Sequence, residues 1–250
     1  MFFTFRLNLK RTVAVLSLVA VLLLLPYFIN ATKRTAATAT PKKVACLTFD
    51  DGPSAYTEQV LAVLDKYGVK ATFFVTGQNE EYFPFIGEAH RAGHQIALHT
   101  YSHEFSKIYA SRESFWTDTN KLQELIVNQT GKASNALRFA GGSSNTICRR
   151  YGGDIMKSLI ADCDERGISY YDWNVDTKDA VNGTISASSI AKRAVDGARQ
   201  QPVAVILMHD GTLGRNAAEA LEIIIPELID EGYSFSRLDE IGAAVHHNID

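Results

Sequence analysis

Short β-rich apolar runs alternate with helical patterns along this chain, from near Lys42 almost to its end. Seven runs predict strands, at residues 44–49, 71–75, 95–98, 136–139, 169–175, 203–208 and 234–238. Helical spacing of apolar residues falls between them, at 57–67, 115–127, 154–166, 188–199 and 217–231. Because strands that alternate with helices form parallel sheets, we expect a single α/β domain with a barrel-like sheet and a site at the carboxyl ends of its strands.

The N-terminal part of the chain has a different pattern. Residues 12–29 form an uncharged run that follows three basic residues. As a helix this run would be roughly 27 Å long, close to the bilayer core of about 30 Å. Its length favours an uncleaved anchor over a signal peptide, although the small residue Ala31 leaves cleavage open. We assign residues 1–30 to a signal or membrane anchor, 31–42 to a linker and 43–250 to one exported domain.

The charge of the chain is divided unevenly between these parts. Residues 1–40 contain five basic residues and no acidic ones, which leaves 20 basic and 28 acidic residues and a net charge of −8 for the remainder. Nucleic-acid binding requires a basic surface, so the acidic domain argues against a nucleic-acid partner.

The three cysteines are too few and too widely spaced for a zinc-type or disulfide framework. Cys46 lies in an apolar run and is predicted to be a small buried hydrophobic residue. The sequence leaves undecided whether Cys148 and Cys163 form a disulfide, which an exported domain would permit.

Polar residues cluster where five of the predicted strands end. The sequences at these ends are TFDDGP (48–53), HTYSH (99–103), RFAGG (138–142), DWNVDTKD (172–179) and LMHD (207–210). The carboxyl ends of parallel strands meet at one end of a barrel, so these clusters are expected to form a single site.

Two histidines and an aspartate are the candidate metal ligands within these clusters. His99 and His103 are four residues apart just after a strand, a spacing that lets both rings face one ion. Asp50 and Asp51 are adjacent before a Gly-Pro turn, and two carboxylates this close favour a cation beside one of them. Two histidines and one carboxylate leave open coordination positions, which is typical of a catalytic site. The other histidines are predicted to be ordinary surface residues: His90, His94, His246 and His247.

The order of the motifs TFDDGP, HTYSH, RFAGG, WNVDTKDA and LMH resembles the polysaccharide deacetylases, the NodB-homology domain of carbohydrate esterase family 4. The resemblance extends from Lys43 to about Leu238. It implies a distorted (β/α)7 barrel and a metal-dependent hydrolase that removes acetyl groups from N-acetylated sugars in a polymer. The N/O ligand set makes zinc our choice of divalent metal.

The resemblance also implies roles for individual residues. It makes three residues the metal ligands: Asp51, His99 and His103. It makes Asp50 the general base, which Arg138 orients. His209 is the implied general acid, tethered by Asp179, with Asp176 as the alternative.

Three further residues are implied to contact the substrate. The backbone N–H at Gly141 would help to hold the oxyanion, and Leu207 would line the pocket for the acetyl methyl group. Trp173 is equally compatible with stacking on a sugar and with core packing. Ala140 and Ala180 replace a proline and a tryptophan of the family, so the substrate preference stays open.

Other functions fit these residues less well. A non-haem iron oxygenase would use the same ligand set but would leave Asp50, Arg138 and His209 idle. A glycosidase needs two carboxylates about 5 Å or more apart on opposite sides of a sugar, which adjacent residues do not provide. A non-catalytic carbohydrate-binding protein would be expected to have lost a ligand or the base. An esterase acting on O-acetylated xylan shares all the motifs.

We expect a monomer that acts on cell-wall polysaccharide, first of all the N-acetylglucosamine of peptidoglycan, and contacts the membrane through its N-terminal segment.

Overall fold

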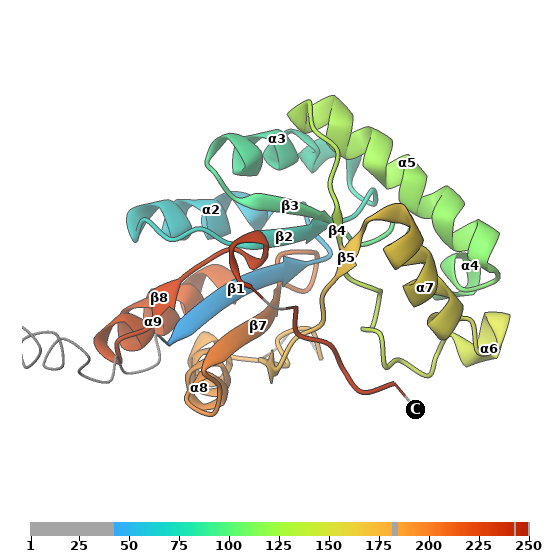
Figure 1. Ribbon diagram of the computed structural model, residues 1–250. Coiled ribbons are helices and arrows are strands. Elements are labelled where there is room, and N and C mark those ends of the chain that lie inside the picture. The colour runs from blue at the N-terminus through green and yellow to red at the C-terminus, as the bar shows by residue number, and fades with distance from the viewer. Residues whose placement is uncertain (1–42, 182–184, 243, 250) are drawn as a thin grey trace, which may run out of the picture. The chain divides into compact units, whose positions relative to one another are not determined.

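The structure is a computed structural model that describes residues 43–181, 185–242 and 244–249 (Figure 1). The predicted signal or anchor at 1–30 and the predicted linker at 31–42 lie outside the described residues. Within the described ranges no helix is both long and apolar enough to cross a membrane. A compact unit begins at Lys43, and the account below concerns this unit.

The described residues form one curled sheet of eight parallel strands. Its order is β5-β4-β3-β2-β1-β7-β6, and β8 pairs with the start of β1. The strands are β1 Val44–Asp50, β2 Thr72–Val75, β3 Gln95–Leu98, β4 Ala136–Leu137, β5 Ser169–Tyr170, β6 Val175–Asp176, β7 Val203–His209 and β8 Ser234–Phe235. The predicted parallel sheet is therefore confirmed, and its longest pairing joins β1 to β7 over the full length of both strands (Figure 1).

The prediction of a single strand at 169–175 is wrong. The segment contains β5 and the start of β6, which lie at opposite ends of the strand order. Between β5 and β6 the backbone N–H of Tyr171 donates to Leu137 of β4, whereas that of Asn174 donates to Val205 of β7. This segment crosses from one end of the sheet to the other. The described strands therefore form a curled half-barrel whose end strands do not pair, rather than a closed seven-stranded ring. The segment combines four β-forming residues with Asp172 and Asn174, which are uncommon in strands and lie where the strand is interrupted.

The five predicted helices are present, and the structure adds three short ones. The helices are α2 Thr57–Lys66, α3 Pro84–Arg91, α4 Phe105–Ile108, α5 Arg112–Thr130, α6 Arg149–Gly152, α7 Met156–Arg166, α8 Ala187–Ala198 and α9 Ala217–Asp230, with 3-10 turns at Glu80–Tyr82 and Leu238–Glu240. The helix α5 begins three residues before its predicted start because the hydroxyl of Ser111 caps the N–H of Ser114. It ends at Gly131, which has the left-handed conformation typical of a helix C-terminus.

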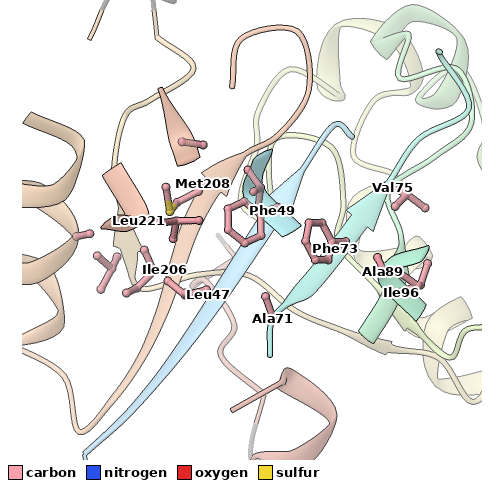
Figure 2. Packing of buried hydrophobic residues seen from close by; sticks show 14 of the residues in the cluster. Leu47, Phe49, Ala71, Phe73, Val75, Ala89, Ile96, Ile206, Met208 and Leu221 are labelled. Atoms are coloured by element: carbon pink, nitrogen blue, oxygen red, sulfur yellow. The ribbon is translucent and has the colours of Figure 1, made fainter. Parts of the chain in front are cut away.

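Successive residues of each strand point to opposite faces of the sheet, and this divides the core in two. Leu47 and Phe49 of β1 point outward, where they pack with Phe73, Ile206 and Met208 beneath the helices (Figure 2). The inner face has a smaller apolar cluster, formed by Cys46, Phe74, Ala97, Ala136, Val205 and Leu238. On β1 and β7 the inner cluster is formed by the paired residues Cys46 and Val205, so the later inner positions of these two strands are free for other side chains.

Candidate active site

The inner face of the sheet becomes polar towards the carboxyl ends of the strands. On the adjacent strands β1 and β7 the register pairs Thr48 with Leu207 and Asp50 with His209. Thr48 and Asp50 alternate with the inner residue Cys46, and Leu207 and His209 alternate with its partner Val205, so all four side chains point to the inner face. The register of neighbouring strands thereby brings residues far apart in the sequence to one place.

Asp51, His99 and His103 converge at this end of the sheet. The Oδ1 atom of Asp51 lies 3.4 Å from Nε2 of His99 and 3.3 Å from Nε2 of His103. The candidate ligand atoms of the three residues all lie within 4.8 Å of one another, so the group could hold a metal ion. The same Oδ1 is buried and has no hydrogen-bond partner, which is unfavourable unless a cation binds it. The residues therefore fit a divalent metal.

The orientation of His99 is set by a backbone carbonyl. Its Nδ1 lies 2.9 Å from the carbonyl oxygen of Arg138. Because a carbonyl can only accept, Nδ1 must donate, and in the neutral ring Nε2 then presents its lone pair towards Asp51. Burial lowers the pKa of His99, but the carboxylates of Asp50 and Asp51 raise it by more. A proton and a metal ion therefore compete for the same nitrogen.

The other two members of the triad have pKa values shifted in the opposite direction. Burial, reinforced by the charge of His99, lowers the pKa of His103. Burial alone would raise the pKa of Asp51, but the adjacent ring of His99 and the charges of the other nearby histidines hold that pKa well below its usual range. Both shifts favour the forms that bind metal, a neutral imidazole and a charged carboxylate.

Asp50 is held by Arg138, which is fully buried. One guanidinium nitrogen, Nη1, donates to Oδ1 of Asp50 at 2.8 Å and to the hydroxyl of Thr48 at 2.9 Å. The remaining donors reach the carbonyls of Tyr171 and Asp172 at 3.1 and 2.9 Å. A buried guanidinium with all of these hydrogen bonds fixes the orientation of the neighbouring carboxylate and pairs with it directly.

His209 is held by Asp179, and Asp176 binds elsewhere. The Nδ1 atom of His209 lies 2.8 Å from Oδ1 of Asp179, and the backbone N–H of His209 donates to Oδ2 at 2.7 Å. Asp176 instead accepts hydrogen bonds from the backbone and the ammonium group of Lys178. Burial alone would lower the pKa of His209, but the hydrogen bond and charge of Asp179, with Asp50 and Asp51, raise it to about 9. The ring is therefore protonated at neutral pH.

The turn after β1 packs tightly against the residue that follows His209. A Cβ added to Gly52 would lie 2.3 Å from Oδ1 of Asp210, so only glycine fits here. The hydroxyl of Thr57 donates to Oδ2 of Asp210 at 2.6 Å. Burial, with smaller contributions from Asp51 and Asp50, raises the pKa of Asp210 to about 7. We assigned no role to Asp210 from the sequence, although its position directly after His209 was a signal.

The glycine segment after β4 is tied to Asp172, which the sequence reasoning missed. Gly141 has a φ of 78°, and no described residue accepts a hydrogen bond from its N–H. Ser143, two residues after Gly141, donates its backbone N–H to the carboxylate of Asp172 at 2.8 Å. Its hydroxyl also donates to this carboxylate. The backbone N–H of His247 binds the same carboxylate at 2.8 Å. Asp172 thereby fixes the backbone around Gly141.

The two remaining predicted substrate contacts lie beside this segment. Leu207 is buried on the inner face of β7, next to Thr48. Trp173 is partly exposed and packs against the inner apolar cluster. A Cβ added to Gly142 would lie 2.9 Å from the ring of Trp173, so this ring borders the glycine segment.

The prediction that the other histidines lie on the surface is wrong for His94. This residue is buried, and its Nδ1 accepts the backbone N–H of Ala71 at 3.1 Å. His246 and His247 of the C-terminal segment do have partners: His246 stacks on Tyr170 with 3.9 Å between ring centroids, and His247 contacts Trp173 edge to face. These rings pack the structure, and the structure places none of them in the triad.

All three cysteines are buried free thiols in the structure. Cys46 lies in the inner apolar cluster, as predicted. Cys148 and Cys163 do not form a disulfide.

Comparison with known proteins identifies the family. The sequence profile of the polysaccharide deacetylases matches residues 37–155. A peptidoglycan-N-acetylglucosamine deacetylase of Bacillus cereus is 31% identical over 216 residues, which are 84% of this chain and 75% of the relative. The chain belongs to the polysaccharide deacetylase family. The resemblance of its motifs to this family is therefore confirmed, and the chain is an enzyme of the carbohydrate esterase family 4 type.

Solved structures of this family share the fold. The catalytic domain of a peptidoglycan N-acetylglucosamine deacetylase from Eubacterium rectale has 39% sequence identity and a TM-score of 0.81, and the match covers 86% of this chain and 99% of that one. A family 4 acetyl xylan esterase from Clostridium thermocellum, solved in complex with a cobalt ion, has 29% identity and a TM-score of 0.66, with 79% and 89% of the two chains covered. A metal ion is thus present in the solved structure of a relative of this polysaccharide deacetylase.

Proposed function

We propose that this polysaccharide deacetylase removes N-acetyl groups from the N-acetylglucosamine of peptidoglycan. The observation that supports this most directly is the arrangement of two ion-paired groups beside the metal triad: Asp50 with Arg138, and His209 with Asp179. One pair supplies a charged carboxylate and the other a protonated imidazole, which are the base and the acid that amide hydrolysis requires. The names of the relatives from Bacillus cereus and Eubacterium rectale support the choice of polymer.

In this proposal Asp51, His99 and His103 hold a divalent metal, for which we propose zinc. When bound, the metal would polarise the amide carbonyl and lower the pKa of a water molecule towards about 7. Asp50 accepts a proton from the water as the water oxygen attacks the carbonyl carbon, and the hydrogen bond from Arg138 orients the carboxylate for this step.

The remaining residues act on the developing charge and on the leaving group. The N–H of Gly141 donates to the carbonyl oxygen as negative charge develops there, an interaction that strengthens in the transition state. His209 donates its Nε2 proton to the nitrogen of the sugar as the C–N bond breaks, which yields acetate and a free amine. Leu207 would contact the methyl group of the acetyl, and Trp173 would border the sugar.

We further propose an extracytoplasmic location, with residues 1–30 as an anchor or a cleaved signal and 31–42 as a linker. The acidic domain gives no general attraction to an anionic wall, so binding must come from the site itself. We propose a monomer without a nucleic-acid partner, which contacts the membrane only through the N-terminal segment.

The proposed substrate is tested by comparing three polymers with the same preparation of enzyme. Peptidoglycan, chitooligosaccharides and acetylated xylan are each incubated with the enzyme, and acetate and primary amines are measured. We expect acetate and amine in equal amounts from the first two polymers, with rates that rise with oligomer length. Equal or faster release from acetylated xylan would contradict the proposal and favour the esterase, an alternative that the similarity to the Clostridium thermocellum enzyme supports.

A further inference from the structure

We propose that Asp118 of α5 is a positioning residue for the metal ligands His99 and His103. Its carboxylate holds the backbone between the two histidines in the conformation that directs both rings at Asp51. The inference rests on the proposed metal site, and it adds a residue from a helix that contributes no ligand of its own to the triad.

Asp118 contacts the middle of residues 99–103, the loop that contains both histidines and is called the ligand loop below. The backbone N–H of Tyr101 donates to Oδ1 of Asp118 at 2.6 Å. The backbone N–H of Ser102 donates to both carboxylate oxygens, at 3.1 and 3.2 Å. Tyr101 and Ser102 lie directly between the two histidines, so one carboxylate binds successive N–H groups of the loop. Hydrogen bonds from N–H groups to a charged acceptor are among the stronger ones in proteins.

The conformation of the loop explains why it needs such a partner. Thr100 has a φ of 85° and His103 a φ of 52°, values in the left-handed region that residues with a side chain rarely adopt. Both lie next to the N–H groups that Asp118 binds. Two strained residues in so short a loop persist only when surrounding contacts hold them.

The loop is also held from a second direction. The carbonyl of Tyr101 accepts the N–H of Gly77 at 2.9 Å, and a Cβ added to Gly77 would lie 2.3 Å from the tyrosine ring. The loop is therefore held by two elements: Gly77, just after β2, binds the carbonyl of Tyr101, and Asp118 of α5 binds its N–H. Loss of the carboxylate would leave the strained residues restrained from one side only.

Helix α5 is a rigid support for the carboxylate. It has 19 residues, and its buried residues Phe115, Thr119 and Leu122 surround Asp118 in sequence and anchor the helix. Asp118 borders a cavity of about 750 Å³, but its oxygens are directed at the backbone of the loop. A site supported by a packed helix is positioned more precisely than one supported by a loop.

The test is the affinity of the protein for the metal alone. Asp118→Ala and Asp118→Asn are compared with the wild type and with Glu124→Gln, which removes an exposed acid from the same helix. The dissociation constant for Zn²⁺ or Co²⁺ is measured by competition with a chelator, and the melting temperature of the metal-free protein is measured in parallel. No substrate is needed, so the result does not depend on which polymer is deacetylated.

We expect Asp118→Ala to raise the dissociation constant by about 10- to 100-fold, the range found when a residue that orients metal ligands is removed. Asp118→Asn keeps one acceptor oxygen, so its dissociation constant should lie between those of the wild type and the alanine variant. Turnover of either variant should recover in excess metal, because Asp50 and His209 do not contact the loop backbone. Glu124→Gln should leave the dissociation constant unchanged.

A dissociation constant within twofold of the wild type in Asp118→Asn and Asp118→Ala would overturn the inference. If the alanine variant does not fold, the nearly isosteric Asp118→Asn decides the question alone. An equal increase in Glu124→Gln would also overturn it, since the effect would then be one of net charge. Absence of metal binding by the wild type is a separate outcome, which refutes the proposed metal site itself.

Discussion

His99 and His209 lie on the same face of the same sheet, yet the Nδ1 atoms of their rings have different partners. The Nδ1 atom of His99 faces a backbone carbonyl, which fixes the ring without adding a full charge. The Nδ1 atom of His209 faces the carboxylate of Asp179, which stabilises the protonated ring. The pKa of both rings is raised, but their surroundings differ. Nε2 of His99 lies beside Asp51, where a metal ion can take the place of a proton, whereas the proton of His209 is stabilised by Asp179.

The same division applies to the adjacent aspartates. Asp50 is bound by the buried guanidinium of Arg138, whereas Oδ1 of Asp51 has no hydrogen-bond partner in the described part of the chain. One carboxylate is neutralised by a cation of the protein, and the other is left for a cation from outside. In the proposed function these two surroundings correspond to a metal-binding region and an acid-base region, and each can be disrupted separately.

Removal of the metal is expected to have the largest effect. A metal that polarises the carbonyl and activates water contributes several kcal/mol, so chelation should reduce turnover by at least about 10³-fold. Added Zn²⁺ or Co²⁺ should restore it. Full turnover by protein shown to be metal-free would contradict the metal-binding region.

Asp50→Asn is expected to have the next largest effect. An amide cannot accept the proton from water, and loss of a general base costs about 10²- to 10⁴-fold in turnover. The variant should keep its metal, because Asp50 is not a member of the triad. Asp230→Asn, a change in an exposed acid at the end of α9, is the matched control and should have normal turnover. A loss smaller than tenfold in Asp50→Asn would exclude Asp50 as the base.

Asp179→Asn is expected to move the alkaline limb of the pH–rate profile. His209 must be protonated to act as the acid, and its pKa is raised to about 9, so turnover should fall as the pH rises through this region. Without the charge of Asp179 the limb should shift downward, towards the ordinary histidine value of about 6.5. Asp176→Asn is the matched control, because Asp176 binds Lys178 instead. A limb that moves only in Asp176→Asn would reverse the assignment.

Asp172→Asn is expected to have the smallest effect on turnover, about tenfold. Its amide nitrogen cannot accept from Ser143 and His247, so the segment that contains Gly141 should lose part of its restraint. Because the change acts through positioning of an oxyanion donor, kcat should fall while KM changes little. A rise in KM alone would show that the segment serves substrate binding instead.

The sequence predicted the site better than it predicted the sheet. The candidate ligands and the acid-base residues follow predicted strands, and parallel strands place their carboxyl ends together, so local pattern was sufficient to group them. The break between β5 and β6 was missed because the aromatic residues and Val175 outweighed Asp172 and Asn174, and long-range hydrogen bonds decide where each half pairs. Pattern also gave no sign that His94 is buried, since its partner Ala71 belongs to a preceding segment.

Residues that support the site without touching the substrate were the hardest to predict. Asp118 binds the loop at Tyr101 from 17 positions away, and Asp172 binds His247 from 75 positions away. An acid on an amphipathic helix or after a strand is ordinary in sequence, and its function appears only when folding brings the acceptor to two N–H groups. The metal ligands, by contrast, have a recognisable spacing of their own.

The division of the site into two histidine regions is tested most directly by comparing His103→Ala with His209→Ala. Metal content and turnover are measured on the same purified samples, with folding checked by circular dichroism. We predict that His103→Ala loses both its metal and its turnover, whereas His209→Ala keeps its metal and loses turnover by about 10²- to 10⁴-fold. Loss of metal from His209→Ala, or full metal content in His103→Ala, would contradict the account.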